Sequence, residues 1–199
     1  MHMPNQNSSR SVNHLASITD FVLAWDGGTE RIRPAAILVT KGDTGEINNE
    51  GRRGCSTSQI VTASHPRFYE FIEPGVRPLV RMLVEKAGWI TYSSCEGHES
   101  AGDILFRPRT VGLFPRATRE RLKQARAMLS AAAGSNLESS APISVVFREE
   151  NLVLNENSMV KCADLVFEST DGNEASYFSK IDSVTACFCR HLAGAIDAA

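Results

Sequence analysis

A helix that leads directly into a strand, at residues 76–93, constrains the fold of this chain more than any other stretch. Apolar side chains recur at helical spacing in its first part: Val76, Leu79, Val80, Leu83 and Ala87. This spacing is typical of a helix with one buried face, and Gly88 suits the left-handed position at which many helices end. The β-branched and aromatic run from Trp89 to Ser93 follows at once and predicts a strand. Such a unit suits an architecture in which helices cover a sheet.

The rest of the chain alternates between apolar runs and helical patterns. Strands are predicted at Phe21 to Trp25, Ala35 to Thr40, Ile104 to Phe106, Thr110 to Phe114, Ile143 to Phe147 and Ala163 to Glu168. Helices are predicted at Pro74 to Ala87, from Thr118 to about Ala133 and from about Ser176 to Ile196. We therefore expect an α/β or α+β fold, with helices packed on a mixed sheet in a single main domain. In that sheet we expect the strand from Thr91 to Ser94 to lie beside Ile143 to Phe147 or Ala163 to Glu168.

Three regions follow from composition along the chain. We expect residues 1–16 to be a flexible tail, residues 17–73 to hold N-terminal strands and a glycine-rich loop, and residues 74–199 to form the α/β core. The loop from Gly42 to Ser58 contains almost no apolar residue, so it is expected to be functional or disordered. Its tip, Gly51 to Thr57, lacks the Gly-Lys-Ser/Thr ending of a phosphate-binding P-loop.

Overall composition excludes several classes of protein. With 199 residues, of which 42% are hydrophobic, the chain is long enough for a well-cored domain and is not disordered as a whole. No run reaches the roughly 18 apolar residues that a membrane span needs, and the polar start lacks the apolar core of a signal peptide. Five cysteines, an odd number, fit packed thiols in a reducing compartment. We expect a soluble, cytoplasmic protein without a membrane partner.

Charge is distributed unevenly along the chain. The net charge is −2, but the window from residue 107 to residue 126 carries about +6. Its basic residues are Arg107, Arg109, Arg116, Arg119, Arg121, Lys123 and Arg126. They either form a solvated helix face or contact an anion such as RNA or a nucleotide, since arginine's forked donors match phosphate oxygens.

The segment Ser93-Ser94-Cys95-Glu96-Gly97-His98, here called the Ser93–His98 motif, places a thiol, a carboxylate and an imidazole at the exit of a strand. Strand ends commonly present functional groups. We predict Cys95, Glu96 and His98 as catalytic residues. The predicted substrate-binding residues are Ser93, Ser94 and Gly97, with a basic rim of Arg107, Arg109 and Arg116.

The backbone geometry of this motif leaves alternatives open. On an extended segment Glu96 and His98 share one face while Cys95 points to the other, which favours a Glu96–His98 acid/base pair. A Cys95–His98 pair, with Cys95 as nucleophile, requires the chain to turn at Gly97. In the purely structural alternative, Cys95 is a packed side chain and the serines and Glu96 satisfy backbone amides in a tight turn.

A second cluster, Cys187-Phe188-Cys189-Arg190-His191, lies in the last predicted helix. Cys187 and His191 share a helix face, but two ligands fall short of the four that a structural zinc site needs. They also belong to an apolar stripe: Ile181, Val184, Cys187, Phe188, His191, Leu192 and Ala195. We therefore predict core packing and no metal.

Residues Val76 to Phe106 resemble the central motif of the wybutosine-synthesising protein 3 family, whose members are tRNA methyltransferases that use S-adenosylmethionine. The corresponding strand of that family ends in Ser-Ser-Cys-Ser-Gly-Arg. Ser93, Ser94, Cys95 and Gly97 match it, whereas Glu96 replaces the serine and His98 the arginine. The resemblance implies a related scaffold and S-adenosylmethionine-dependent methyl transfer.

Together these features predict an enzyme or enzyme-like protein that acts on RNA or a nucleotide, in a cleft formed by the Ser93–His98 motif and its basic rim. Methyl transfer is the reaction that the resemblance implies. The alternative is a non-catalytic binding or regulatory module that holds an anionic ligand or a partner protein in the same cleft.

Overall fold

In the computed structural model, the described residues are 25, 63, 68–102, 105–115, 119–134, 141–155 and 158–198. The expected tail at 1–16, the loop from Gly42 to Ser58 and Arg116 lie outside them. The chain divides into two compact units: residues 1–74 with 150–162, and residues 75–149 with 163–199. The second unit carries the Ser93–His98 motif.

In the first unit the described residues are 25, 63, 68–74, 150–155 and 158–162. The 3₁₀-helix η3 spans Phe68–Phe71, and Phe68 meets the buried Trp25 edge to face, with ring centroids 5.4 Å apart. Of the strand predicted at Phe21 to Trp25, only Trp25 lies within the described residues, and it is helical. A short apolar run does not by itself distinguish a buried strand from a buried helix.

The helix predicted at Pro74 to Ala87 is present but changes its winding. It begins as the α-helix α3, Arg77–Arg81, and continues as the π-helix η4, Met82–Lys86. The Ala87 N–H donates to the Met82 carbonyl, five residues back, at 3.1 Å. The predicted apolar stripe is buried at Val76, Leu79, Val80 and Leu83. Gly88 ends the helix with a φ of 71°, as its position in the sequence indicates.

Four strands form the sheet in the order β1-β2-β4-β3. They are β1 (Trp89–Cys95), β2 (Arg109–Pro115), β3 (Ile143–Asn155) and β4 (Ser158–Ser169). β2 pairs antiparallel with both β1 and β4, so the α+β class is confirmed, with antiparallel pairing at these two junctions where we expected a mixed sheet. The reason is local: β1 and β2 are joined by an extended two-stranded ribbon, without the crossover helix that parallel strands need.

Two of the strand predictions need correction in detail. A strand was predicted at Ile104 to Phe106. Its described residues, Leu105 and Phe106, belong to no strand and lie in the connection between β1 and β2. We also expected β1 beside β3 or β4, whereas β2 separates it from both. Sequential strands joined by a hairpin-like connection pair with each other first.

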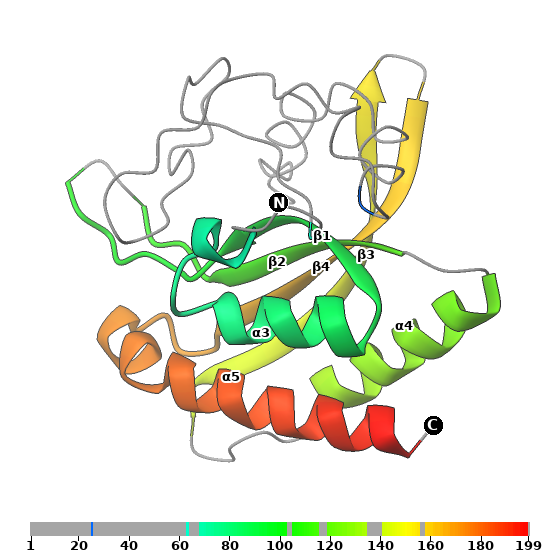
Figure 1. The fold of residues 1–199 in the computed structure, drawn as a ribbon. Helices are drawn as coiled ribbons and strands as arrows, with labels where there is room; N and C mark the ends of the chain where they lie inside the picture. Colours follow the sequence, from blue (N-terminus) through cyan, green and yellow to red (C-terminus); the bar gives the residue numbers. More distant parts are fainter. Residues whose placement is uncertain are drawn as a thin grey trace. The chain divides into compact units, whose positions relative to one another are not determined.

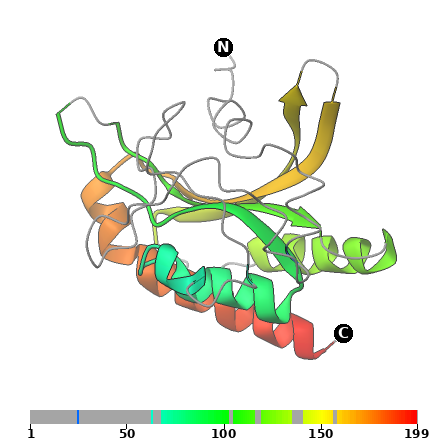
Figure 2. The ribbon, with the colours of Figure 1, turned by 45° about the horizontal axis from the view of Figure 1, so that its top comes forward.

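The helices α3, α4 (Arg119–Ala133) and α5 (Glu174–Asp197) lie on the same face of the sheet (Figures 1 and 2). On β2 the alternate residues Val111 and Leu113 are fully buried. Phe167 on β4 meets Phe188 on α5 edge to face, with centroids 5.7 Å apart. Phe167 is the register partner of Arg109, so the residues of β2 on the same face as Arg109, which include Val111 and Leu113, point toward the helices.

The long helix α5 begins at a side-chain cap, since Asn173 Oδ1 accepts the Ser176 N–H at 3.0 Å. Its buried stripe contains Ile181, Val184, Phe188 and Leu192, as predicted. His191, which we placed in that stripe, is exposed, and Cys187 is half-buried. No helix in the described part of the chain is long and apolar enough to cross a membrane.

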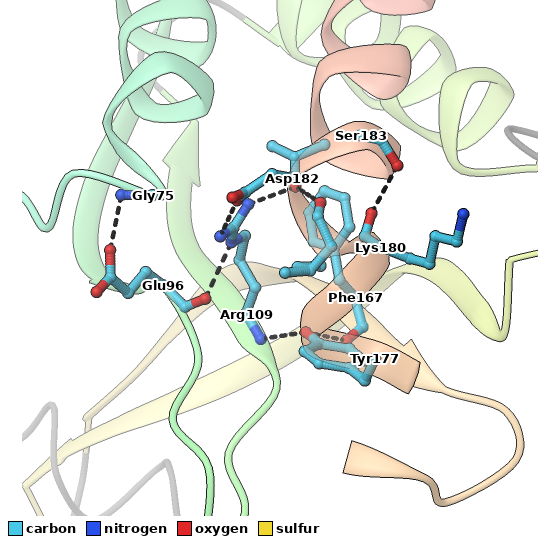
Figure 3. A network of polar contacts seen from close by, with 10 residues as sticks. Gly75, Glu96, Arg109, Phe167, Tyr177, Lys180, Asp182 and Ser183 are labelled. Carbon is cyan, nitrogen blue, oxygen red and sulfur yellow. Dashed lines mark hydrogen bonds and ion pairs between the residues drawn. The ribbon is translucent and has the colours of Figure 1, made fainter. Parts of the chain in front are cut away.

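Tyr177 on α5 joins this helix to two strands through its hydroxyl group. The hydroxyl donates to the Phe167 carbonyl at 2.9 Å and accepts the Arg109 N–H at 2.7 Å (Figure 3). Arg109 and Phe167 are register partners in the β2–β4 ladder, and the Tyr177 hydroxyl lies between these two backbone groups. Burial raises the pKa of Tyr177 from its usual 10.0 to about 12, against the smaller opposing effect of Arg109. The folded protein therefore keeps this phenol protonated.

Replacement of Tyr177 by phenylalanine should lower the free energy of unfolding by about 1–3 kcal/mol, because it strands a buried amide and a buried carbonyl. Between pH 10 and about 12 the unfolded wild-type chain loses the phenol proton while the folded chain keeps it, so wild-type stability should fall as the pH rises through this window. The variant should lack that loss. Urea denaturation of both proteins across the pH range measures both effects. If the stability of the variant falls between pH 10 and about 12 as much as that of the wild type, the raised pKa does not belong to Tyr177.

Candidate functional site

The end of β1 is shaped by a β-bulge. Thr91 pairs with Leu113 and Ser93 with Gly112, so the register shifts by one residue between them. Beyond the bulge, Ser94 is the partner of Val111, on the helix-covered face, and Cys95 is the partner of Thr110. Because successive strand residues point to opposite faces, the Cys95 side chain lies on the face away from the helices. A bulge beside a functional group is a common way of redirecting a side chain.

The chain turns at Gly97, immediately after the strand. The φ of Gly97 is 98°, in a region that favours glycine. A Cβ atom there would lie 3.2 Å from both the Arg107 carbonyl oxygen and the Arg109 nitrogen. Beyond the turn, His98 and Arg107 exchange backbone hydrogen bonds of 3.0 and 2.9 Å. Glycine is thus required both by the conformation and by the close approach of the opposite strand.

This turn brings Cys95 and His98 together. The Cys95 Sγ and a ring nitrogen of His98 lie within 4.8 Å of each other, and both residues are half-buried. On an uninterrupted strand, residues three apart would point to opposite faces. The condition that we set for a Cys95–His98 pair, a turn at Gly97, is therefore met.

Glu96 is directed elsewhere. Its Oε2 accepts the Gly75 N–H at 2.6 Å, directly ahead of α3, and its backbone carbonyl accepts from Arg109 Nε at 3.0 Å (Figure 3). A Cβ atom on Gly75 would lie 2.8 Å from both Glu96 Oε2 and Arg109 Nη2. The Glu96 carboxylate therefore satisfies a backbone amide in a closely packed corner, which is the role that the structural alternative gave it.

We expected Arg109 on the rim of the cleft, but it lies in the interior of the protein. Its side chain is 4% exposed, against 82% for its ion-pair partner Asp182. The guanidinium donates from Nη1 to Thr185 Oγ1 at 2.7 Å and from Nη2 to Asp182 Oδ1 at 2.8 Å (Figure 3). Arg109 shares the alternation of Val111 and Leu113, so the period-two pattern of β2 places it on the helix-covered face.

Arg107 is the predicted basic residue that does lie beside the pair. It is half-buried and faces His98 across the ribbon. Side chains of directly paired residues project from the same face of an antiparallel ribbon, so the side chains of Arg107 and His98 leave the ribbon on the same face.

Two other members of the predicted basic patch, Lys123 and Arg126, lie on α4. Lys123 is exposed and Arg126 Nε pairs with Glu149 Oε1 at 3.1 Å. Of the predicted substrate-binding residues, Ser93 is exposed, Ser94 is half-buried and Gly97 is buried. Ser93 is thus the most accessible polar group of the motif.

Sequence analysis missed the residues of α5 that hold this site. Besides Tyr177, Thr185 and Asp182, they include Glu174, whose carboxylate accepts the Ser100 N–H at 2.8 Å and also the Ser100 hydroxyl. These hydrogen bonds lower the pKa of the Glu174 carboxyl from its usual value. Ser100 and Glu174 are 74 residues apart, so no local pattern could reveal the contact.

Two further thiols of this unit, Cys187 and Cys189, lie on α5. Burial raises the pKa of the Cys189 thiol to about 11, although Arg109 and Arg190 oppose the shift. In the described residues of this unit, no three histidine, cysteine or acidic ligand atoms come together, so Cys187 and His191 gain no third ligand there.

Compared with known proteins, the chain matches no family model, no curated protein and no solved structure.

Replacement of Gly97 by alanine should lower the free energy of unfolding by roughly 1–3 kcal/mol, because a side chain at this φ is strained and its Cβ would press on the opposite strand. Gly194 is a matched control: it lies within α5, and a Cβ atom there would have nothing within 4 Å. Its replacement by alanine should raise stability by about 0.5–1 kcal/mol. Urea denaturation compares the two. Equal effects would contradict the role given to the turn.

Proposed function

We propose that this protein is an enzyme or enzyme-like protein that acts on RNA or a nucleotide, with Cys95 and His98 as its reactive pair. The observation that carries the proposal is their proximity: the thiol sulfur and an imidazole nitrogen lie within 4.8 Å. This proximity depends on a bulge and on a glycine-dependent turn. A packed cysteine needs neither device.

The proposed roles follow from the chemistry of the side chains. His98 accepts the thiol proton of Cys95, because a neutral imidazole is a base near neutral pH and the thiolate is the nucleophilic form of cysteine. Arg107, beside His98, binds a phosphate oxygen through its forked donors. Ser93 contributes a hydroxyl group to substrate binding, because it lies on the same face as Cys95, whereas Ser94 points to the helix-covered face. Glu96 fixes the turn through its bond to the Gly75 amide instead of transferring protons.

The reaction proposed by resemblance is methyl transfer from S-adenosylmethionine. Support for it is limited to the matching Ser93, Ser94, Cys95 and Gly97, and we assign no residue to the cofactor. A ligand that binds the folded state raises its stability, so S-adenosylmethionine should raise the melting temperature if this reaction is the correct one.

A non-catalytic module that binds an anion is the second candidate. It is favoured by the fact that two of the predicted functional groups, the Glu96 carboxylate and the Arg109 guanidinium, form internal contacts. In that case Arg107 and Ser93 alone would contact the ligand, and Cys95 would show no dependence on His98.

Cys95 should react with iodoacetamide faster than Cys189, whose thiolate is disfavoured by its raised pKa. The His98→Ala variant should slow the reaction of Cys95 by at least about tenfold near neutral pH, since a general base commonly contributes more than that. Peptide mapping by mass spectrometry follows each cysteine separately. If Cys95 reacts equally fast in both proteins, the reactive pair does not exist and the binding module becomes the better explanation.

Binding of single-stranded RNA should weaken steeply with salt, and Arg107→Ala should reduce the slope of log affinity against log salt by about 0.7, the value for one lost phosphate contact. Lys123→Ala is the matched control, because Lys123 is exposed on α4 and belongs to the same basic window of the sequence. It should leave the slope unchanged. Fluorescence anisotropy at several salt concentrations measures this; an equal change in both variants would assign the charge effect to the patch as a whole.

A further inference from the structure

The side chain of Arg109 is hydrogen-bonded to the backbone of the turn in the Ser93–His98 motif. Arg109 Nε donates to the Glu96 carbonyl at 3.0 Å, one residue after Cys95 and two before His98. The same guanidinium reaches Thr185 and Asp182 on α5, and the backbone N–H of Arg109 is bound by the Tyr177 hydroxyl. Figure 3 shows the contacts of Arg109 with Glu96 in the turn and with Tyr177 and Asp182 on α5.

We propose that Arg109 is the positioning residue of the Cys95–His98 pair and that α5, through Asp182 and Thr185, fixes the orientation of its guanidinium. This inference rests on the proposed function, because it concerns the spacing of the reactive pair. Arg109 touches neither substrate nor the reacting atoms in this scheme. It acts by fixing the carbonyl of Glu96, and with it the direction in which the chain leaves Cys95.

The geometry requires an arginine at this position. Three separate donors, Nε, Nη1 and Nη2, each meet an acceptor at 3.0 Å or less. A lysine ammonium would bring one compact donor group to acceptors spread around a planar fork. The corner is also tightly packed, since a Cβ atom on Gly75 would lie 2.8 Å from Arg109 Nη2. The guanidinium therefore has little freedom to adopt another orientation.

The α5 side of the contact offers the more informative substitutions. The Thr185 hydroxyl, which accepts from Arg109, donates to the Ile181 carbonyl at 2.7 Å and so is oriented by the helix itself. Asp182 supplies the negative charge from an exposed position. Its removal leaves the core packing intact but deprives the buried guanidinium of its charged partner, so it tests positioning without opening a cavity.

The experiment is a double-mutant cycle between the positioning residue and His98, with the rate of Cys95 alkylation by iodoacetamide as the readout. The proteins are the full chain as wild type, Arg109→Lys, Asp182→Ala, Asp182→Glu and Asp197→Asn, each with and without His98→Ala. Asp197→Asn is the control, an exposed acid on the same helix. The buried Cys162 serves as an internal reporter, because it reacts only when the protein opens.

His98→Ala should slow the alkylation of Cys95 in the wild-type background. If Arg109 positions the pair, this slowing should be smaller by roughly tenfold or more in the Arg109→Lys background, since a misplacement of reacting groups by about 1 Å can lower a rate on the order of a hundredfold. Asp182→Ala should reduce it less, and Asp182→Glu, which keeps the carboxylate, should restore it. Cys162 should react at the wild-type rate throughout these Asp182 variants, and Asp197→Asn should behave as wild type.

Two other outcomes separate the possible failures. An effect of His98→Ala that is just as large in the Asp182→Ala and Arg109→Lys backgrounds overturns the positioning role while leaving the reactive pair standing. Faster labelling of Cys162 in Asp182→Ala assigns Asp182 to global stability and also overturns it. If His98→Ala has no effect in the wild-type background, the proposed function itself fails. Should Arg109→Lys not fold, the Asp182 variants alone decide the question.

Discussion

The burial of one guanidinium group governs how this unit is assembled. A charged side chain taken out of water costs several kcal/mol unless it is paired and hydrogen-bonded. Arg109 meets that requirement with three acceptors that come from two distant parts of the chain, the turn after β1 and the helix α5. These acceptors can be in place together only when the strand, the turn and the helix are docked. Arg109 thereby links the stability of the fold to the geometry of its candidate site.

The hydroxyl group of Tyr177 also holds α5 to the sheet, through hydrogen bonds to two backbone groups. Tyr177 binds across the β2–β4 ladder, at the residue pair where Arg109 faces Phe167. Its phenol ring also meets Phe106 and Phe178 edge to face, with centroids 5.2 and 5.0 Å apart. The first turns of α5 are therefore held to the sheet by polar and aromatic contacts at once, at the end of the sheet from which the ribbon leaves.

The elements that sequence analysis predicted correctly are those with a strong local pattern. The helix before Gly88, the strand after it, and the stripe of α5 follow from apolar periodicity alone. The placement of Arg109 on a rim was wrong, because the predicted strand began at Thr110, one residue after Arg109, whereas β2 includes Arg109. The partners of Arg109 were not accessible from the sequence, since Asp182 and Thr185 are 73 and 76 residues away. Contacts at such a separation are decided by how the elements dock, which single-sequence patterns do not encode.

The bulge between Thr91 and Ser93 has a consequence beyond the direction of Cys95. Among the described strands β1 lies at one end of the order, and an edge strand offers unpaired backbone donors and acceptors to any extended chain nearby. A bulge interrupts the regular spacing of those groups and increases the local twist, so a second strand cannot continue the sheet along this edge in register. The irregularity that places the thiol within reach of an imidazole also makes this edge a poor template for aggregation.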